Sequence, residues 1–147
     1  MNIFLRCADL NDNLLLFKWF NNADSFKFKI KTKNKVSFIK HTQWFAERFK
    51  DKTTFMWIIE DEKKEPLGQI RFQHSKDNFY DIDIYIIERV RQLGIATKAL
   101  KNAETISNLK PLRATVKKNN NTSYLFFDRN GYSIKSEDKK CWIFIKA

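Results

Sequence analysis

The 147-residue sequence contains few residues that interrupt helices and strands, with 3 glycines and 2 prolines. A flexible linker is therefore not expected, and we predict one domain over residues 1–147. Its two cysteines, Cys7 and Cys141, form no CxxC pair and have no histidine at metal-ligand spacing. We expect neither a disulfide framework nor a metal site, and we interpret both cysteines as packed core residues.

Long apolar runs are also missing, since none approaches the roughly 20 residues that a membrane helix requires. Residues 1–6 lack a basic region followed by an apolar stretch, so we expect no signal peptide. These absences favour a cytoplasmic protein that does not bind membranes.

What is abundant is positive charge, because 28 basic residues against 17 acidic ones give a formal net charge of +11. Such a charge favours an anionic partner, which could be nucleic acid, an acidic membrane or a phosphorylated small molecule. However, 21 of the basic residues are Lys, whereas recognition of bases and phosphates favours the bidentate Arg side chain. No nucleic-acid motif accompanies the charge, and we expect no nucleic-acid partner. The densest basic stretch, residues 26–33, either attracts an acidic acceptor or forms a solvated lysine fringe.

Apolar spacing predicts a mixed α/β fold around one sheet. We expect a first helix that Asp9 or Asn11 caps and that ends near Asn21, then helices over residues 38–49, 94–109 and 121–130. Strands are expected over residues 3–6, 53–60, 67–74, 79–87, 112–116, 131–134 and 141–145. The predicted order is β-α-α-β-β-β-α-β-α-β-β.

The segment with the most chemical content follows the strand 79–87 and reads Arg91-Gln92-Leu93-Gly94-Ile95-Ala96-Thr97. The first amides of the helix that starts there have no intrahelical acceptors, and the helix dipole adds positive potential. Gly94 and Ala96 keep side chains away, so the segment predicts a backbone cradle for a diphosphate. An ordinary strand–helix turn is the alternative interpretation.

A second segment, N-x-x-S-x-x-x-F-x-R-x-G-Y, runs from Asn120 to Tyr132. Together with Arg91-x-x-Gly94-x-Ala96 it resembles the GNAT superfamily of N-acetyltransferases. The resemblance implies acetyl-CoA as co-substrate and a sheet whose fourth and fifth strands splay apart. It implies that the co-substrate lies along the following residues: Tyr85, Ile86, Ile87, Arg91, Gln92, Gly94, Ile95, Ala96, Thr97, Asn120, Ser123 and Phe127.

The resemblance further implies direct attack of a neutral amine on the thioester. The Glu and Tyr that many members use for proton transfer are replaced here by Thr115 and Phe127. Because neither side chain can act as a general base or acid, we predict Asp83 or His74 as the catalytic base. Tyr124 or Tyr132 is an alternative proton donor.

Three N-terminal features resemble the branch of this superfamily that acetylates nucleotide-linked amino sugars for bacterial surface glycans. They are residues 16–21, the His41-x-x-Trp44-Phe45 motif and residues 68–72, which place His41, Trp44, Gln69 and Arg71 at the acceptor. We expect a small-molecule amine acceptor of this kind and a monomer or homodimer. A protein N-terminus, a lysine or a polyamine is an alternative acceptor, and a basic nucleic-acid-binding module is the non-enzyme alternative.

Overall fold

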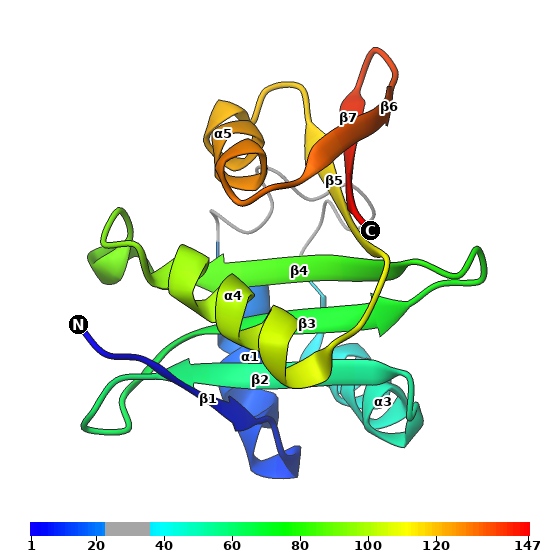
Figure 1. Ribbon diagram of the computed structural model, residues 1–147. Helices are drawn as coiled ribbons and strands as arrows, with labels where there is room; N and C mark the ends of the chain where they lie inside the picture. The colour runs from blue at the N-terminus through cyan, green and yellow to red at the C-terminus, as the bar shows by residue number, and fades with distance from the viewer. Residues whose placement is uncertain (23–35) are drawn as a thin grey trace.

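In the computed structural model, which describes residues 1–22 and 36–147, seven strands form one sheet in the order β1-β2-β3-β4-β5-β7-β6 (Figure 1). The strands are β1 (Phe4–Cys7), β2 (Thr54–Glu60), β3 (Pro66–His74), β4 (Tyr80–Ile86), β5 (Leu112–Lys117), β6 (Ser133–Glu137) and β7 (Cys141–Lys146). Neighbouring strands are antiparallel except for β4 and β5, which are parallel. The parallel pair marks the point where the chain crosses over through a helix.

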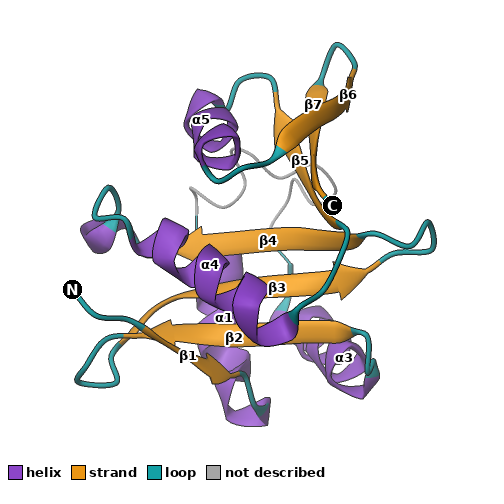
Figure 2. Ribbon diagram, in the orientation of Figure 1, coloured by secondary structure: helices purple, strands orange, loops and turns teal. Residues whose placement is uncertain are grey.

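The helices lie on both faces of this sheet. They are α1 (Asn13–Phe20), α3 (Phe38–Lys50), α4 (Ile95–Ser107) and α5 (Asn121–Arg129), with short 3₁₀ turns at Leu10–Asp12 and Glu88–Val90. Figure 2 shows α4 across one face of β2 to β4, α1 and α3 behind the opposite face, and α5 beside β5. The mixed α/β fold and the predicted element order are confirmed.

Side chains just before α3 and α1 fix these two helices in different ways. The Ser37 hydroxyl accepts a hydrogen bond from the Lys40 amide at 3.2 Å, as expected for an N-cap. Asp12 precedes α1 and is buried, and its carboxylate accepts two hydrogen bonds of 2.9 Å from the Arg6 guanidinium. This pair ties α1 to the edge strand β1.

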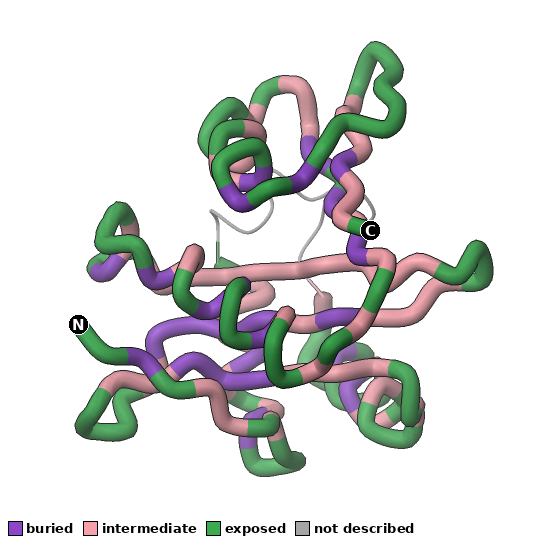
Figure 3. The backbone as a smooth tube through the Cα atoms, viewed as in Figure 1, coloured by how far each residue is buried: buried purple, intermediate pink, exposed green. Residues whose placement is uncertain are grey.

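Two apolar clusters hold the helices against the sheet. Between the sheet and α4 the buried residues include Ile70, Phe72 and Leu100, whereas Leu16, Phe45 and Ile58 form a smaller cluster under α1 and α3. Figure 3 shows buried positions along β2 and β3, while β4 is only half-buried along its length. The incomplete burial of a central strand points to an open space beside β4.

The structure bears differently on the expectations for Cys7 and for the basic stretch. Cys7 is exposed, so the prediction that it packs in the core is wrong, because it ends the edge strand β1. The basic stretch of residues 26–33 lies outside the described residues. No helix within the described ranges has both the length and the apolar composition needed to cross a membrane.

Candidate functional site

The parallel strands β4 and β5 pair over only two positions, Tyr80 with Leu112 and Asp81 with Arg113. Since β4 continues to Ile86, the rest of the strand diverges from β5, and the predicted splay is confirmed. The Tyr80 amide donates to the Pro111 carbonyl across the closed end at 3.0 Å. Because backbone groups alternate along a strand, the amides and carbonyls of Ile82 and Ile84 point into the gap.

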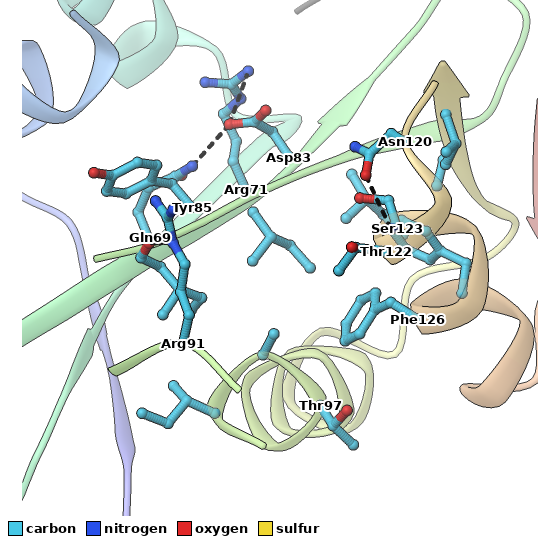
Figure 4. A pocket seen from close by; sticks show the side chains of 18 of the residues that line it. Gln69, Arg71, Asp83, Tyr85, Arg91, Thr97, Asn120, Thr122, Ser123 and Phe126 are labelled. Carbon is cyan, nitrogen blue, oxygen red and sulfur yellow. Dashed lines mark hydrogen bonds and ion pairs between the residues drawn. The ribbon is translucent and has the colours of Figure 1, made fainter. Parts of the chain in front are cut away.

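A cavity of about 910 Å³ passes through this gap and has lining residues from both faces of the sheet. On one face it is bordered by α1, α3 and the outward side chains of β3 and β4, which we call the α3 side. On the other face it is bordered by the start of α4, by β5 and by α5, which we call the α4 side. Figure 4 shows Gln69, Arg71 and Asp83 on one side of β4, and Thr97, Ser123 and Phe126 on the other. The gap thus joins two chemically different chambers.

The α4 side is built around the first turn of a helix. Gly94 immediately precedes α4 with φ of +78°, a left-handed conformation that glycine adopts without strain. A Cβ atom at Gly94 would meet no other atom within 4 Å, so the space outside this turn is open. The predicted cradle residues Gln92, Gly94, Ile95, Ala96 and Thr97 all line the cavity. Amides and dipole together make this turn suited to an anion.

Arg91 extends from the same loop toward the end of β4. Its Nε donates to the Ile86 carbonyl at 2.8 Å, and its guanidinium carbon lies 5.7 Å from the centre of the Tyr85 ring. Tyr85 and Ile86 line the cavity, whereas Ile87 does not, and the Ile87 amide donates to the Leu67 carbonyl instead. The gap-facing backbone of Ile82 and Ile84 was missed from sequence, although strand alternation could have identified it.

Helix α5 forms the opposite wall of the α4 side. The Asn120 side chain accepts from the Ser123 amide at 3.1 Å and caps the helix. Asn120, Ser123 and Phe127 line the cavity, together with Thr122 and Phe126, which sequence analysis did not single out. The sequence motif does not include Thr122 or Phe126, because their place in the cavity wall depends on how α5 packs.

The α3 side contains a polar group of three residues on neighbouring strands. Gln69 Nε2 donates to Asp83 Oδ2 at 2.8 Å, and Arg71 Nη2 lies 3.9 Å from the same oxygen. Arg71 and Asp83 are direct cross-strand partners. Asp83 therefore has a fixed carboxylate whose side chain is 40% exposed and faces the cavity.

Aromatic side chains surround this polar group. The guanidinium carbon of Arg71 lies 4.9 Å from the centre of the Trp44 ring, and Trp19 packs on Tyr85 at 5.6 Å between ring centres. His41 also lines the cavity but is buried, with its ring 6.0 Å from that of Phe45. Burial lowers the pKa of His41 below its usual value of 6.5, although a hydrogen bond with the Asn13 backbone opposes this shift. His41 is therefore neutral at pH 7.

Other residues considered for proton transfer lie away from the cavity. His74 does not line it, and its ring packs on Tyr80 at 5.0 Å. Tyr124 does not line it and packs on Trp142 at 4.6 Å. The Tyr132 hydroxyl donates to Glu104 at 2.7 Å, and burial together with this carboxylate raises the pKa of the phenol. Among the proposed proton carriers, Asp83 alone combines position and chemistry.

Within the described ranges, no group of three His, Cys, Asp or Glu side chains is placed so that it could hold a metal ion. Lys98 near the start of α4 does not line the cavity, and its Nζ donates to the Met1 carbonyl at 2.7 Å. The cavity thus has a helix start on one side and a carboxylate on the other.

Comparison with known proteins agrees with this geometry. Residues 2–133 match the family model of the acetyltransferase (GNAT) domain. The acetyltransferase PseH of Campylobacter jejuni is 27% identical over an alignment of 137 residues, which covers 90% of this chain and 85% of that protein.

Solved structures extend the likeness to the fold. The spermidine N-acetyltransferase SpeG of Vibrio cholerae in complex with CoA and spermine matches with a TM-score of 0.79 and 15% identity, over 97% of this chain and 92% of that one. A domain from Methanocaldococcus jannaschii matches with a TM-score of 0.80 and 22% identity, over 99% and 97% of the two chains. Identities this low show the shared fold and carry no information on the acceptor.

Proposed function

This chain belongs to the GNAT acetyltransferase domain family, and from that premise we propose that it acetylates a nucleotide-linked amino sugar. The family fixes the reaction as acetyl transfer from acetyl-CoA to an amine. The acceptor is our own inference, and it is supported by the side chains of the α3 side and by the sequence resemblance of residues 16–21, 41–45 and 68–72.

We assign the α4 side to coenzyme A. The open space outside Gly94 and the first amides of α4 fit the diphosphate. The gap-facing backbone of Ile82 and Ile84 offers the groups with which the pantetheine arm would extend the sheet. Asn120 and Ser123 border the same path from α5. Bound there, acetyl-CoA supplies an activated acyl group at the point where the gap reaches the α3 side.

Asp83 is then the proton acceptor for the reaction. The acceptor amine forms a bond to the thioester carbonyl carbon, the carbon–sulfur bond breaks, and the amine proton passes to the Asp83 carboxylate. The departing thiolate takes its proton from solvent, since Thr115 and Phe127 cannot supply one. Gln69 holds the carboxylate in place through its 2.8 Å hydrogen bond. A positioned carboxylate of this kind contributes about 10²- to 10⁴-fold to rate.

The charge of the cavity is the observation that carries the choice of acceptor. On the α3 side, where the acceptor would bind, the charged residues among the described lining residues are one carboxylate, Asp83, and one arginine, Arg71. A polyamine carries several positive charges and would need several carboxylates to replace its hydration. A sugar nucleotide has one amine and an anionic diphosphate, which matches one carboxylate beside one arginine.

A panel of amines tests this proposal. The protein is incubated with labelled acetyl-CoA and either UDP-hexosamines carrying a free amine at carbon 2, 3 or 4, or spermidine, or a peptide with free amines. We expect chromatography to show acetylation of at least one UDP-hexosamine at a kcat/KM at least tenfold above that of spermidine. Acetylation of spermidine or the peptide alone would reject the sugar-nucleotide acceptor while leaving the acetyltransferase reaction intact.

A further inference from the structure

The Arg71 side chain on the α3 side is an incompletely paired cation. Within the described part of the chain its guanidinium donates no hydrogen bond, and its Nε is buried without a partner. The separation of 3.9 Å between its Nη2 and Asp83 Oδ2 is too long for a hydrogen bond. The side chain is nevertheless only 18% exposed. Buried polar groups in folded proteins are normally paired, so this guanidinium calls for a further partner.

Its surroundings hold the guanidinium in place without satisfying it. The Trp44 ring lies 4.9 Å from the guanidinium carbon, a cation–π contact that leaves the N–H donors at the edge of the plane available. The backbone of Arg71 is fixed in the middle of β3, opposite Asp83. An oxyanion approaching from the cavity would therefore meet an oriented pair of donors, which is the arrangement that binds phosphate or carboxylate in a bidentate manner.

We propose that Arg71, held by Trp44, binds an oxyanion of the acceptor and thereby determines which amines are acetylated. The proposal rests on the acetyltransferase function above and deepens it, since it names the acceptor group that the α3 side recognises. For a sugar nucleotide that group is the diphosphate. Arg71 is a specificity-determining residue and takes no proton.

The neighbouring carboxylate does not depend on Arg71 for its position. Gln69 Nε2 donates to Asp83 Oδ2 at 2.8 Å, so Asp83 stays in place when the guanidinium binds an incoming anion. Anion recognition and proton transfer thus involve two adjacent but separate side chains. Loss of Arg71 should raise the KM for the acceptor with little change in kcat.

The first test measures binding of UDP alone to the protein saturated with CoA, by isothermal titration calorimetry. Saturation with CoA keeps UDP from binding at the α4 side. We expect Arg71→Gln to weaken UDP binding at least tenfold and Arg71→Lys to restore it only in part. Arg89→Gln is the matched control, because Arg89 is an exposed residue that pairs with Glu65 outside the cavity and should not affect binding. Absence of UDP binding to the wild-type protein, or equal binding by Arg71→Gln, would overturn the proposal.

The second test separates this proposal from the proposed function. Initial rates are measured with the best amino sugar of the panel as its UDP derivative, its 1-phosphate and the free sugar. Arg71→Gln should raise the KM of both phosphorylated forms at least tenfold and leave that of the free sugar unchanged. Equal effects on all three would refute an anion site at Arg71 even if acetylation is efficient. UDP binding that depends on Arg71, without acetylation of any UDP-hexosamine, would support the anion site and refute the proposed acceptor.

The same assays identify the source of the oxyanion. Free amino acids bring a carboxylate and an amine together and serve as the competing substrates. Acetylation of an amino acid with an Arg71-dependent KM would keep the oxyanion site and assign it to a carboxylate, whereas the charge and size of the cavity lead us to expect the phosphorylated sugar.

Discussion

At the scale of single residues, Asp83 shows how a strand can turn an ordinary side chain into a candidate base. Its carboxylate lies on the cavity face of β4 and is oriented by Gln69 from the neighbouring strand. His74, the other residue predicted from sequence, is on β3 but packs on Tyr80 away from the cavity. Both have suitable chemistry, and position along the strands separates them.

Substitution of Asp83 by Asn tests the proposed base directly. Asp83→Asn keeps the size of the side chain and an oxygen that can accept from Gln69, but it removes the proton acceptor. We expect kcat to fall about 10²- to 10⁴-fold with little change in the KM for acetyl-CoA. Steady-state kinetics measure both, with Asp61→Asn in the exposed turn after β2 as control. A kcat within threefold of the wild type would show that another group takes the proton.

At the scale of elements, the start of α4 combines backbone conformation with anion binding. Gly94 has a positive φ that a residue with a side chain adopts at a cost of about 1–2 kcal/mol. The space around its missing side chain is open, so a substitution there would not clash with the rest of the protein. Effects on folding and on binding can therefore be separated at this position.

We predict that Gly94→Glu abolishes acetyl-CoA binding while the protein remains folded. The new carboxylate would occupy the open space and repel the diphosphate. Gly94→Ala is the matched variant, because it has the same backbone strain without the charge. Calorimetric titration with acetyl-CoA should show loss of binding in the Glu variant and a much smaller effect in the Ala variant. Equal affinity of the Glu variant and the wild type would refute the cradle at α4.

At the closed end of the gap, a side chain of β5 contacts β4 and the turn before β4. Arg113 on β5 donates from Nε to Asp81 Oδ1 at 2.6 Å and from Nη2 to Asp81 Oδ2 at 3.0 Å. It also pairs with Asp77 in the turn before β4. These contacts join the two strands at the point beyond which they separate.

The contribution of Asp77 in this cluster to stability should depend on pH. Hydrogen bonds from Arg113 and Ser75 lower the pKa of Asp77 to about 2. A carboxylate with a lowered pKa stabilises the fold above its ordinary pKa of 3.8, and that contribution is lost as the pH falls toward 2. In Arg113→Leu, we expect an NMR titration to place the pKa of Asp77 well above its wild-type value. An unchanged Asp77 titration would show that Arg113 does not determine the charge of this turn.

At the scale of the whole molecule, the net charge of +11 is compatible with two kinds of anionic partner. The fold and the family favour acetyl-CoA, whose phosphates would bind at one defined helix start. Nonspecific association with nucleic acid would instead spread over many lysines and weaken steeply with salt.

Thermal unfolding separates these partners. Acetyl-CoA at about 100 times its Kd should stabilise the protein by about 2.7 kcal/mol. For a domain of this size that corresponds to a rise in Tm of about 5–10 °C. A DNA oligomer at moderate salt should leave Tm unchanged. A rise in Tm with DNA and none with acetyl-CoA would contradict the function assigned to the cavity.

Part of this structure can be predicted from local sequence pattern. The order of helices and strands follows from apolar spacing, and the segments at Gly94 and Asn120 follow from motifs within a few residues. Such features depend on neighbours in the chain, and sequence carries them directly. Whether His74 or Asp83 faces the cavity depends instead on the twist and register of β3 and β4, which single-strand patterns do not contain.

The sequence by itself therefore determined the fold class, the family resemblance and the segment suited to a diphosphate, because each is encoded in short-range spacing. Tertiary structure decided which polar residues meet. It placed Trp44 of α3 against Arg71 of β3 and Gln69 beside Asp83. These contacts join residues that are separated in the chain, and they arise only when helices pack on a formed sheet.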